Sequence, residues 1–150
     1  MRVLLQRVRE ASVIANGKLS GEIKKGVLLL VSIEESDVEN DITWLANKIT
    51  NLRIFPDSEG VMNLSLLDID GEALVVSQFT LHASTKKGNR PSYIKAAKPD
   101  FANKMYELFK QKLQNLINQR IASGVFGADM QISLTNNGPV TIWLDSKNKE

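Results

Sequence analysis

The chain has 150 residues, one His, no Cys and a formal net charge of +2, from 19 Lys and Arg against 17 Asp and Glu. These counts exclude a disulfide framework, a thiol nucleophile, an iron–sulfur cluster, a zinc site made of thiolates and any site that needs two imidazoles from one chain. The charge is well below the excess of a protein that binds nucleic acid mainly by neutralising phosphates. Any catalysis must therefore use hydroxyls, carboxylates, backbone groups or the substrate.

The length suits a single domain, which we expect to span residues 1–150, because a chain of this size can form a core without cross-links. No apolar run approaches the ~20 residues needed to cross a bilayer. Arg2, Arg7 and Arg9 interrupt the apolar residues near the N-terminus, so no signal peptide is expected. The sequence predicts a cytoplasmic protein with no membrane partner.

The first third of the chain has the pattern of strands joined by tight turns. The expected strands cover residues 3–8, 11–15, 18–23 and 27–33. Asn16-Gly17 predicts a type I′ hairpin turn, since both central positions of that turn need φ > 0. The last of these strands is almost entirely apolar, which indicates burial on both faces of a sheet.

The middle of the chain predicts a helix and then a strand. Apolar residues recur at helical spacing over 37–52, and Ser36 or Asp37 is expected to cap this helix. Short extended pieces follow at 53–56 and 61–66. Asp70-Gly71 is a hairpin signal that leads into a strong strand over 73–81.

The last third predicts a long helix over 99–120, with Pro99 near its first position and Gly124 as a stop signal. Two closing strands are expected at 130–134 and 140–144, with a turn between them. Since the strands come in hairpins and not in regular alternation with helices, the predicted fold class is α+β. We expect a single domain with a mostly antiparallel or mixed, barrel-like sheet and two main helices.

The expected strand end at 77–82 carries two hydroxyls, an amide and the only His. In a regular strand Thr80 and His82 would point to the same face, so they form a candidate nucleophile and base. Ser77 would point to the other face, and no carboxylate that could orient His82 is identifiable. The structural alternative is a buried strand with polar residues at its mouth.

Three other segments have both a structural and a functional interpretation. Gly138-Pro139 is a turn between strands, or a rigid backbone element that displays carbonyls if its peptide bond is cis. The basic segment 86–93 is an exposed loop, or a phosphate-binding loop beside the aromatic ring of Tyr93. The segment 124–130 is a helix stop, or a place where glycines allow a ligand to approach the backbone closely.

Taken together, four segments resemble the D-aminoacyl-tRNA deacylase family. They are Ser-Gln-Phe-Thr-Leu at 77–81, Lys-Gly-Asn-Arg-Pro-Ser at 87–92, Phe-Gly-Ala-Asp-Met at 126–130 and Asn-Gly-Pro-Val-Thr at 137–141. Their order and spacing match the family, as does the start of the chain, so the resemblance covers nearly every residue. The motif at 77–81 followed by the motif at 137–141 is far more specific to the family than any single motif.

The resemblance implies a homodimer that acts on the acceptor end of tRNA mischarged with a D-amino acid. Such an enzyme hydrolyses the ester at the terminal adenosine, releases free tRNA and the D-amino acid, and also removes glycine. The resemblance implies proofreading of translation without a cofactor. We assign no metal to Asp68 and Asp70, which lie at a turn.

The resemblance also implies roles for individual residues in the reaction. The ester site would be lined by Ser77, Gln78, Phe79 and Thr80. The backbone N–H of Phe79 or Thr80, or the Gln78 amide, could stabilise the oxyanion. The 2′-hydroxyl of the terminal ribose, and not Thr80, would activate water or attack the ester.

Substrate selection is assigned to two further groups of residues by the resemblance. The adenosine pocket would be shaped by Phe126, Gly127, Ala128 and Met130. Gly138-Pro139, cis in the family, would reach into the active site of the partner subunit and exclude L-residues by its rigid backbone, and Arg7 would hold it in position.

Two departures and two alternatives accompany this interpretation. His82 follows a motif at a variable family position and is not taken as catalytic, and Tyr93 stands where Phe is common. One alternative is a Thr80-dependent hydrolase of small esters. The other is a non-enzymatic module that binds nucleic acid through its basic loops, which steep salt dependence without turnover would reveal.

Overall fold

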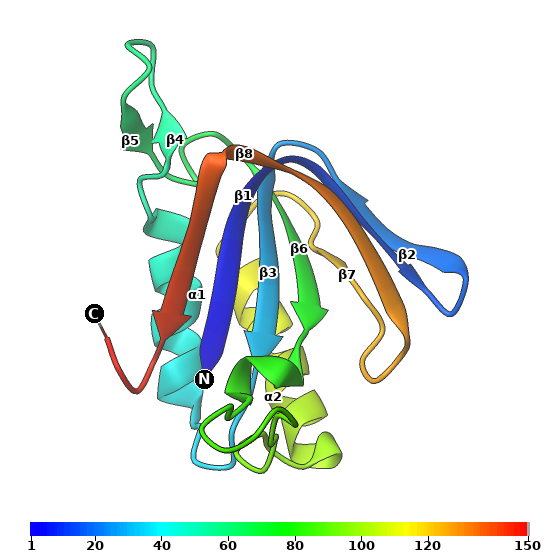
Figure 1. Ribbon diagram of the computed structural model, residues 1–150. Coiled ribbons are helices and arrows are strands. Elements are labelled where there is room, and N and C mark those ends of the chain that lie inside the picture. The colour runs from blue at the N-terminus through cyan, green and yellow to red at the C-terminus, as the bar shows by residue number, and fades with distance from the viewer. Residues whose placement is uncertain (150) are drawn as a thin grey trace.

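A six-stranded mixed sheet forms the body of the computed structural model, which describes residues 1–149. Two helices, α1 (Glu39–Asn51) and α2 (Pro99–Gln114), cover one face of this sheet (Figure 1). The strands of the sheet are β1 (Arg2–Ala15), β2 (Lys18–Ile23), β3 (Gly26–Ser32), β6 (Glu72–Ser77), β7 (Ala122–Ser123) and β8 (Met130–Asp145). The predicted α+β class with two helices is confirmed.

The long strand β1 is the centre of the sheet. One edge pairs with β8 from Arg2 to Ala15, and the other edge pairs first with β3 and then with β2. The sequence predicted two strands here and two in the region of β8, but each pair is one continuous strand. The turn predicted within residues 136–139 is instead a bend of β8, where the register against β1 shifts twice and the Gly138–Pro139 peptide bond is cis.

The predicted hairpin turn at Asn16-Gly17 is confirmed. Asn16 has φ 49° and Gly17 has φ 77°, and the flanking residues Ala15 and Lys18 pair with each other. At the far edge of the sheet, the Ser20 hydroxyl on β2 donates to the Ser123 carbonyl on β7 at 2.9 Å. This contact nearly closes the sheet into a barrel, as the sequence predicted.

The core lies between the sheet and the two helices. Strand β3 is buried along almost its whole length and runs parallel to β6, which makes the sheet mixed. Large side chains that are fully buried include Leu5, Leu29, Phe55 and Phe109. A small ribbon of β4 (Phe55–Pro56) and β5 (Met62–Leu64) lies outside the main sheet.

Both helices differ at their ends from the sequence prediction. Helix α1 begins at Glu39 with Val38 as its N-cap, and the Asp41 carboxylate accepts the Val38 N–H at 2.8 Å. Neither Ser36 nor Asp37 caps it, because Asp37 bonds to the Met1 ammonium and to the Glu34 N–H instead. Helix α2 ends at Gln114 and not near 120, so Gly124 does not stop it.

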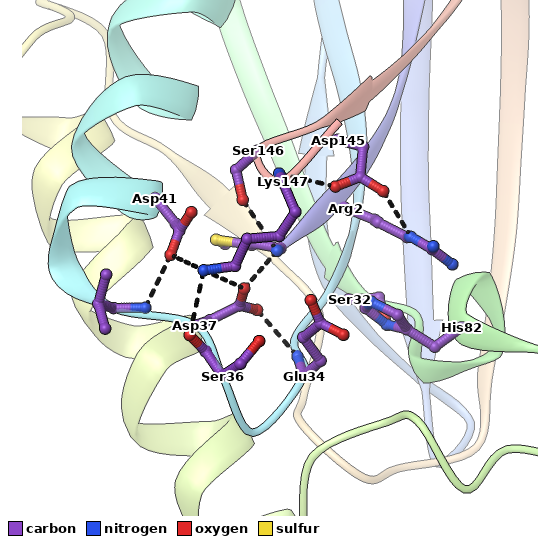
Figure 2. Close-up of polar contacts among 12 residues, drawn as sticks. Arg2, Ser32, Glu34, Ser36, Asp37, Asp41, His82, Asp145, Ser146 and Lys147 are labelled. Atoms are coloured by element: carbon purple, nitrogen blue, oxygen red, sulfur yellow. Dashed lines mark hydrogen bonds and ion pairs between the residues drawn. The ribbon is translucent and has the colours of Figure 1, made fainter. Parts of the chain in front are cut away.

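A charged cluster ties the two ends of the described chain to the start of α1 (Figure 2). The Met1 ammonium bonds to Asp37 and, at 2.9 Å, to the Ser146 hydroxyl. The Lys147 ammonium lies 2.8 Å from Asp41. We call these five residues the charged cluster; every polar group named here has a partner inside it.

The strand predicted over 73–81 ends early. Strand β6 stops at Ser77, and Phe79–His82 forms a 3₁₀ turn, η1, after Gln78 donates its N–H to the Val31 carbonyl at 2.7 Å. The predicted alternation of side chains therefore does not apply to Thr80 and His82. Neither helix within residues 1–149 is long and apolar enough to span a membrane.

Candidate functional site

A cavity of about 560 Å³ opens where the parallel strands β3 and β6 end. Its walls come from these two strand ends, from Phe79 in η1, from the segment that leads into α2, and from residues 126–132. Ligand sites are frequent at the carboxyl ends of parallel strands, because loops from several elements converge there. The fold thus brings together segments that lie far apart in the sequence.

The motif at 77–80 forms one wall of the cavity. Ser77, Gln78 and Phe79 line it directly. Thr80 is one hydrogen bond away, since the Gln78 side-chain amide donates to the Thr80 hydroxyl at 2.6 Å. These four residues were predicted to lie together, and η1 places them together by a turn instead of a strand.

The candidate couple of Thr80 and His82 is not formed. His82 is buried, and its Nδ1 lies 2.6 Å from the Ser32 hydroxyl on β3, while the Thr80 hydroxyl contacts Gln78. Burial, followed by the positive charge of Arg2, lowers the pKa of His82 below its ordinary value. The hypothesis of a Thr80–His82 hydrolase loses its geometric basis because the chain turns after Ser77.

The segment predicted to shape an adenosine pocket forms the facing wall. Phe126, Gly127, Ala128 and Met130 all line the cavity. Gly127 has φ 73°, a left-handed conformation that glycine adopts without strain, and it turns the chain between Phe126 and β8. The Phe126 ring packs on Tyr106 of α2 with ring centroids 5.9 Å apart, which fixes this wall to the core.

The rim of the cavity carries two exposed aromatic rings. Phe79 is 57% exposed and Tyr93 is 39% exposed, and their rings meet edge to face with centroids 5.1 Å apart. Exposed aromatic side chains of this kind offer faces for stacking of nucleobases. The sequence placed Tyr93 at the end of the basic segment, and its ring lies beside Phe79 of the motif at 77–80.

All the lining residues of the cavity are neutral. Its polar groups are the hydroxyls of Ser32, Ser77 and Tyr93 and the amide of Gln78, together with backbone groups. In the part of the chain that the structure describes, no three His, Asp or Glu side chains converge as metal ligands would. The cavity can therefore hold an uncharged group through hydrogen bonds, stacking and shape.

A second cavity, of about 620 Å³, lies among β1, β2 and β8. Four charged residues line it: Glu10, Glu22, Lys24 and Glu72. It is slightly larger, but it contains none of the residues that the motifs single out. We therefore place the functional site in the neutral cavity.

Gly138 and Pro139 lie at the bend of β8, far from this cavity. Both residues are exposed. The Arg7 guanidinium donates from Nε to the Asn137 carbonyl at 2.9 Å and from Nη1 to the Ile54 carbonyl, so it supports the bend from beneath. At Gly138, which has φ 125°, an added Cβ would lie 2.6 Å from the Arg7 Nη2 atom.

The strand register places the bend of β8 away from the cavity of the same chain. Ser77 pairs with Val31, which pairs with Val3, whereas the bend lies opposite Arg7. Four residues along β1 span about 13 Å, and three strand spacings of about 4.8 Å separate β6 from β8. Figure 1 shows the bend of β8 and η1 at opposite ends of the sheet.

A basic segment borders the cavity on its outer side. Residues 83–98 contain no Asp or Glu and carry five cations, Lys86, Lys87, Arg90, Lys95 and Lys98. All five residues are exposed, and a pair of backbone hydrogen bonds between Ser84 and Ser92 closes the base of the loop. Local positive charge is thus concentrated beside a neutral cavity, although the whole chain is only slightly basic.

Among the lining residues that the sequence analysis did not assign to a site are Ser32, Pro99 and Ala102. Pro99 and Ala102 belong to the first turn of α2 and were interpreted only as helix residues. Ser32 ends an apolar strand, and its hydroxyl was the one available signal. Their place in the cavity depends on packing between elements, which spacing along the chain does not reveal.

Comparison with known proteins gives a consistent result. The family model described as D-Tyr-tRNA(Tyr) deacylase matches residues 4–145. Proteins named D-aminoacyl-tRNA deacylase from Porphyromonas gingivalis, Flavobacterium johnsoniae and Bacteroides thetaiotaomicron are 61%, 59% and 59% identical, over the full length of both chains.

Solved structures give the same fold. A structure titled c-Myc DNA unwinding element binding protein is 37% identical, with a TM-score of 0.91 over 97% of this chain and 98% of that one. A structure described as a probable eukaryotic D-amino acid tRNA deacylase is 17% identical, with a TM-score of 0.81 over 95% and 97% of the two chains. The second likeness supports the α+β fold alone.

Proposed function

Since the chain belongs to the D-Tyr-tRNA(Tyr) deacylase family, we propose that it hydrolyses the ester between a D-amino acid and the terminal adenosine of tRNA. It is a hydrolase that acts on ester bonds. One observation of the structure carries the proposal: residues of the motifs at 77–80 and 126–130, about fifty residues apart in sequence, line the same neutral cavity. We place the whole chain in one catalytic domain that works in the cytoplasm, where tRNA is charged.

The cavity favours a reaction driven by hydrogen bonds and by the substrate. It offers no charged side chain as a general base, and the Thr80 hydroxyl is engaged by Gln78. We assign the oxyanion to the backbone N–H of Phe79 or Thr80, with the Gln78 amide as a further donor. The 2′-hydroxyl of the terminal ribose then activates a water, which attacks the ester carbonyl and releases the D-amino acid and the ribose hydroxyl of free tRNA; the protein mainly positions these groups.

Chiral selection is assigned to Gly138 and Pro139 of a second copy in a homodimer. Support comes from their exposure, from the Arg7 hydrogen bond to Asn137, and from their distance from the cavity of their own chain. A backbone wall held in this way excludes a side chain that points into it, so an L-residue clashes and a D-residue does not. Glycine has no side chain to exclude and is hydrolysed as well.

The basic segment is the proposed contact for the phosphates of the tRNA acceptor end. Lys86, Lys87 and Arg90 stand at the loop tip beside the cavity, and Phe79 and Tyr93 offer faces to unpaired bases. Few phosphate contacts are needed when only the acceptor end is bound, which agrees with the net charge of +2.

The test is single-turnover deacylation of matched D-tyrosyl-, L-tyrosyl- and glycyl-tRNA. We expect rapid hydrolysis of the D-ester and the glycyl ester and only the uncatalysed rate for the L-ester. Equal rates on the D- and L-esters, or none on either, would refute the proposal. The variant Thr80→Ala should keep substantial activity, and a loss of more than about a thousandfold would exceed one oxyanion donor and indicate a Thr nucleophile.

One observation favours a second candidate function, binding of nucleic acid without catalysis. The structure that is 37% identical is titled as a DNA unwinding element binding protein, and the basic segment supplies cations for phosphates. Tight and steeply salt-dependent binding of uncharged nucleic acid, with no ester cleavage, would select this function.

A further inference from the structure

The only imidazole of the chain lies buried beneath the turn that carries the proposed oxyanion donors. His82 is the last residue of η1 and is 1% exposed, and its Nδ1 lies 2.6 Å from the Ser32 hydroxyl (Figure 2). The same hydroxyl lies 3.2 Å from the Phe79 carbonyl. Three groups from β3 and η1 thus form a short chain of polar contacts at the floor of the cavity.

Counting protons along this chain assigns a direction to each contact. The Ser32 hydroxyl has one proton, and the Phe79 carbonyl can only accept. Both contacts are hydrogen bonds only if Ser32 donates to Phe79 and His82 donates from Nδ1 to Ser32. Nε2 is buried and has no acceptor among residues 1–149, so we assign it no proton and the imidazole is neutral.

The Phe79 carbonyl belongs to the same planar peptide unit as the Thr80 N–H. In a trans peptide these two groups point in opposite directions, so holding the carbonyl also sets the direction of the N–H. The other carbonyls of the turn are held independently: Leu81 donates its N–H to Gln78, Ala83 to Thr80, and Arg2 donates to Leu81 at 3.1 Å. Within the turn, Ser32 alone supplies a side-chain donor to the unit that carries the Thr80 N–H.

We propose that Ser32 and neutral His82 are positioning residues for the deacylation, because they fix the peptide unit that presents the Thr80 N–H to the oxyanion. The inference rests on the proposed function, and it assigns neither side chain to the reacting atoms. His82 orients Ser32, Ser32 holds the Phe79 carbonyl, and the carbonyl holds the N–H.

Protonation of His82 should disrupt this arrangement. A proton on Nε2 would have no acceptor, and the new charge would face Arg2 on β1 and the Met1 ammonium, with Glu34 and Asp37 as the opposing anions. Burial and Arg2 lower the pKa of His82, so the neutral form persists through neutral pH and the rate should fall only below pH 6.5. Above that pH the profile should be flat after subtraction of uncatalysed hydrolysis.

The direct structural test is the tautomer of His82, read by long-range ¹H–¹⁵N NMR of the free protein. Because the chain has one His, the imidazole signals need no assignment by mutation. We expect the neutral form with the proton on Nδ1 at pH 7. A proton on Nε2, or a charged ring at pH 7, would overturn the proposal whether or not the protein deacylates tRNA.

The functional test compares Ser32→Ala, His82→Leu and His82→Asn in single-turnover deacylation. Ser32→Ala and His82→Leu should lower the maximal rate about 10- to 100-fold. This loss is smaller than that for complete removal of an oxyanion donor, because the Thr80 N–H is still present but less well oriented. KM should change less than about threefold. Asn can donate to Ser32 from the place of Nδ1 but does not titrate. His82→Asn should therefore deacylate within about threefold of the wild-type rate and should show no decline in rate below pH 6.5.

Ser20→Ala is the matched control for Ser32→Ala, because Ser20 also donates to a backbone carbonyl but lies away from the cavity. It should deacylate at the wild-type rate. A wild-type rate for His82→Leu, or an acid decline that survives in His82→Asn, would overturn the proposal. If His82→Leu fails to fold, the His82→Asn pH profile and the NMR tautomer still decide it. Absence of activity in the wild type would refute the proposed function instead.

Discussion

The charged cluster and the neutral cavity lie at the same end of the sheet but use polar groups in opposite ways. In the charged cluster, Met1, Asp37, Asp41 and Lys147 bind one another within the chain. In the cavity, every lining residue is neutral, and the polar groups are hydroxyls, one amide and backbone groups. Charges that are already paired stabilise a fold, whereas unengaged polar groups in a cavity are available to a ligand.

Arg2 connects the two regions. Its Nε lies 2.9 Å from the carboxylate of Asp145, the residue before Ser146 of the charged cluster (Figure 2). Its Nη1 donates to the carbonyl of Leu81 in η1 at 3.1 Å. Changes in the charged cluster should therefore alter stability, and changes in the cavity should alter deacylation.

The largest effect is expected from Asp37→Asn in the charged cluster. This change leaves the buried Met1 ammonium without its anion, and breaking a buried pair typically costs about 3–5 kcal/mol. Urea unfolding should show this loss, while the folded fraction deacylates normally. Asp100→Asn, at an exposed first-turn position of α2, is the control. A cost below about 1 kcal/mol would contradict the role given to this pair.

The opposite behaviour is expected from Ala128→Phe, which fills the cavity. We expect kcat/KM for the D-ester to fall at least about a hundredfold, which corresponds to ~2.7 kcal/mol of transition-state binding. The free energy of unfolding should change little, since Ala128 is only partly buried. Val125→Phe, at an exposed position outside the lining, should retain activity. If Ala128→Phe keeps the wild-type kcat/KM, the ester does not bind in this cavity.

A smaller effect concerns pH and Asp41. Burial acts to raise the pKa of Asp41, but hydrogen bonds from Lys147 and the Val38 N–H outweigh it and lower the pKa from 3.8 to about 2. The folded pKa is the lower one, so this carboxylate stabilises the fold fully above pH 4, and the contribution is lost as pH falls towards 2. Its size is at most about 2 kcal/mol, because Lys147 is partly exposed and solvent screens the pair.

Unfolding measured between pH 2 and 5 checks the Asp41 prediction. Asp41→Asn should remove this part of the acid dependence, whereas Glu39→Gln, at an exposed acid in the same helical turn, should preserve it. If both variants keep the wild-type slope, the bond between Asp41 and Lys147 does not act as described.

The smallest effect is expected from Tyr106→Phe, behind the cavity wall. The Tyr106 hydroxyl donates to the buried Val75 carbonyl at 2.8 Å, and its removal should cost about 1–2 kcal/mol of stability. Because the Phe ring preserves the packing on Phe126, deacylation should stay within about twofold of wild type. A large loss of activity with unchanged stability would place Tyr106 in the reaction.

Features encoded by neighbouring residues were predictable from the sequence. The Asn16-Gly17 turn follows from two positions that tolerate positive φ, and the burial of β3 follows from its apolar run. Residues of the motifs at 77–80 and 126–130, which a resemblance singled out, lie in two walls of one cavity. In each of these cases the information lies within a few adjacent residues.

Features that depend on distant partners were not predictable. Asp37 has the sequence position of a helix cap, but the Met1 ammonium binds it. Gln78 belongs to an apparent strand, but its N–H bonds to Val31 and the chain turns, which separates Thr80 from His82. No periodicity encodes such contacts, because the two partners lie about 36 to 50 residues apart along the chain.

The central claim is that a neutral cavity leaves the reactive hydroxyl to the substrate. The most direct measurement is single-turnover deacylation of D-tyrosyl-tRNA whose terminal adenosine lacks the 2′-hydroxyl, compared with the ribose form. The account predicts a rate at least about a hundredfold lower for the deoxy substrate, with similar binding. Equal rates would contradict it and would require a protein group that activates the water.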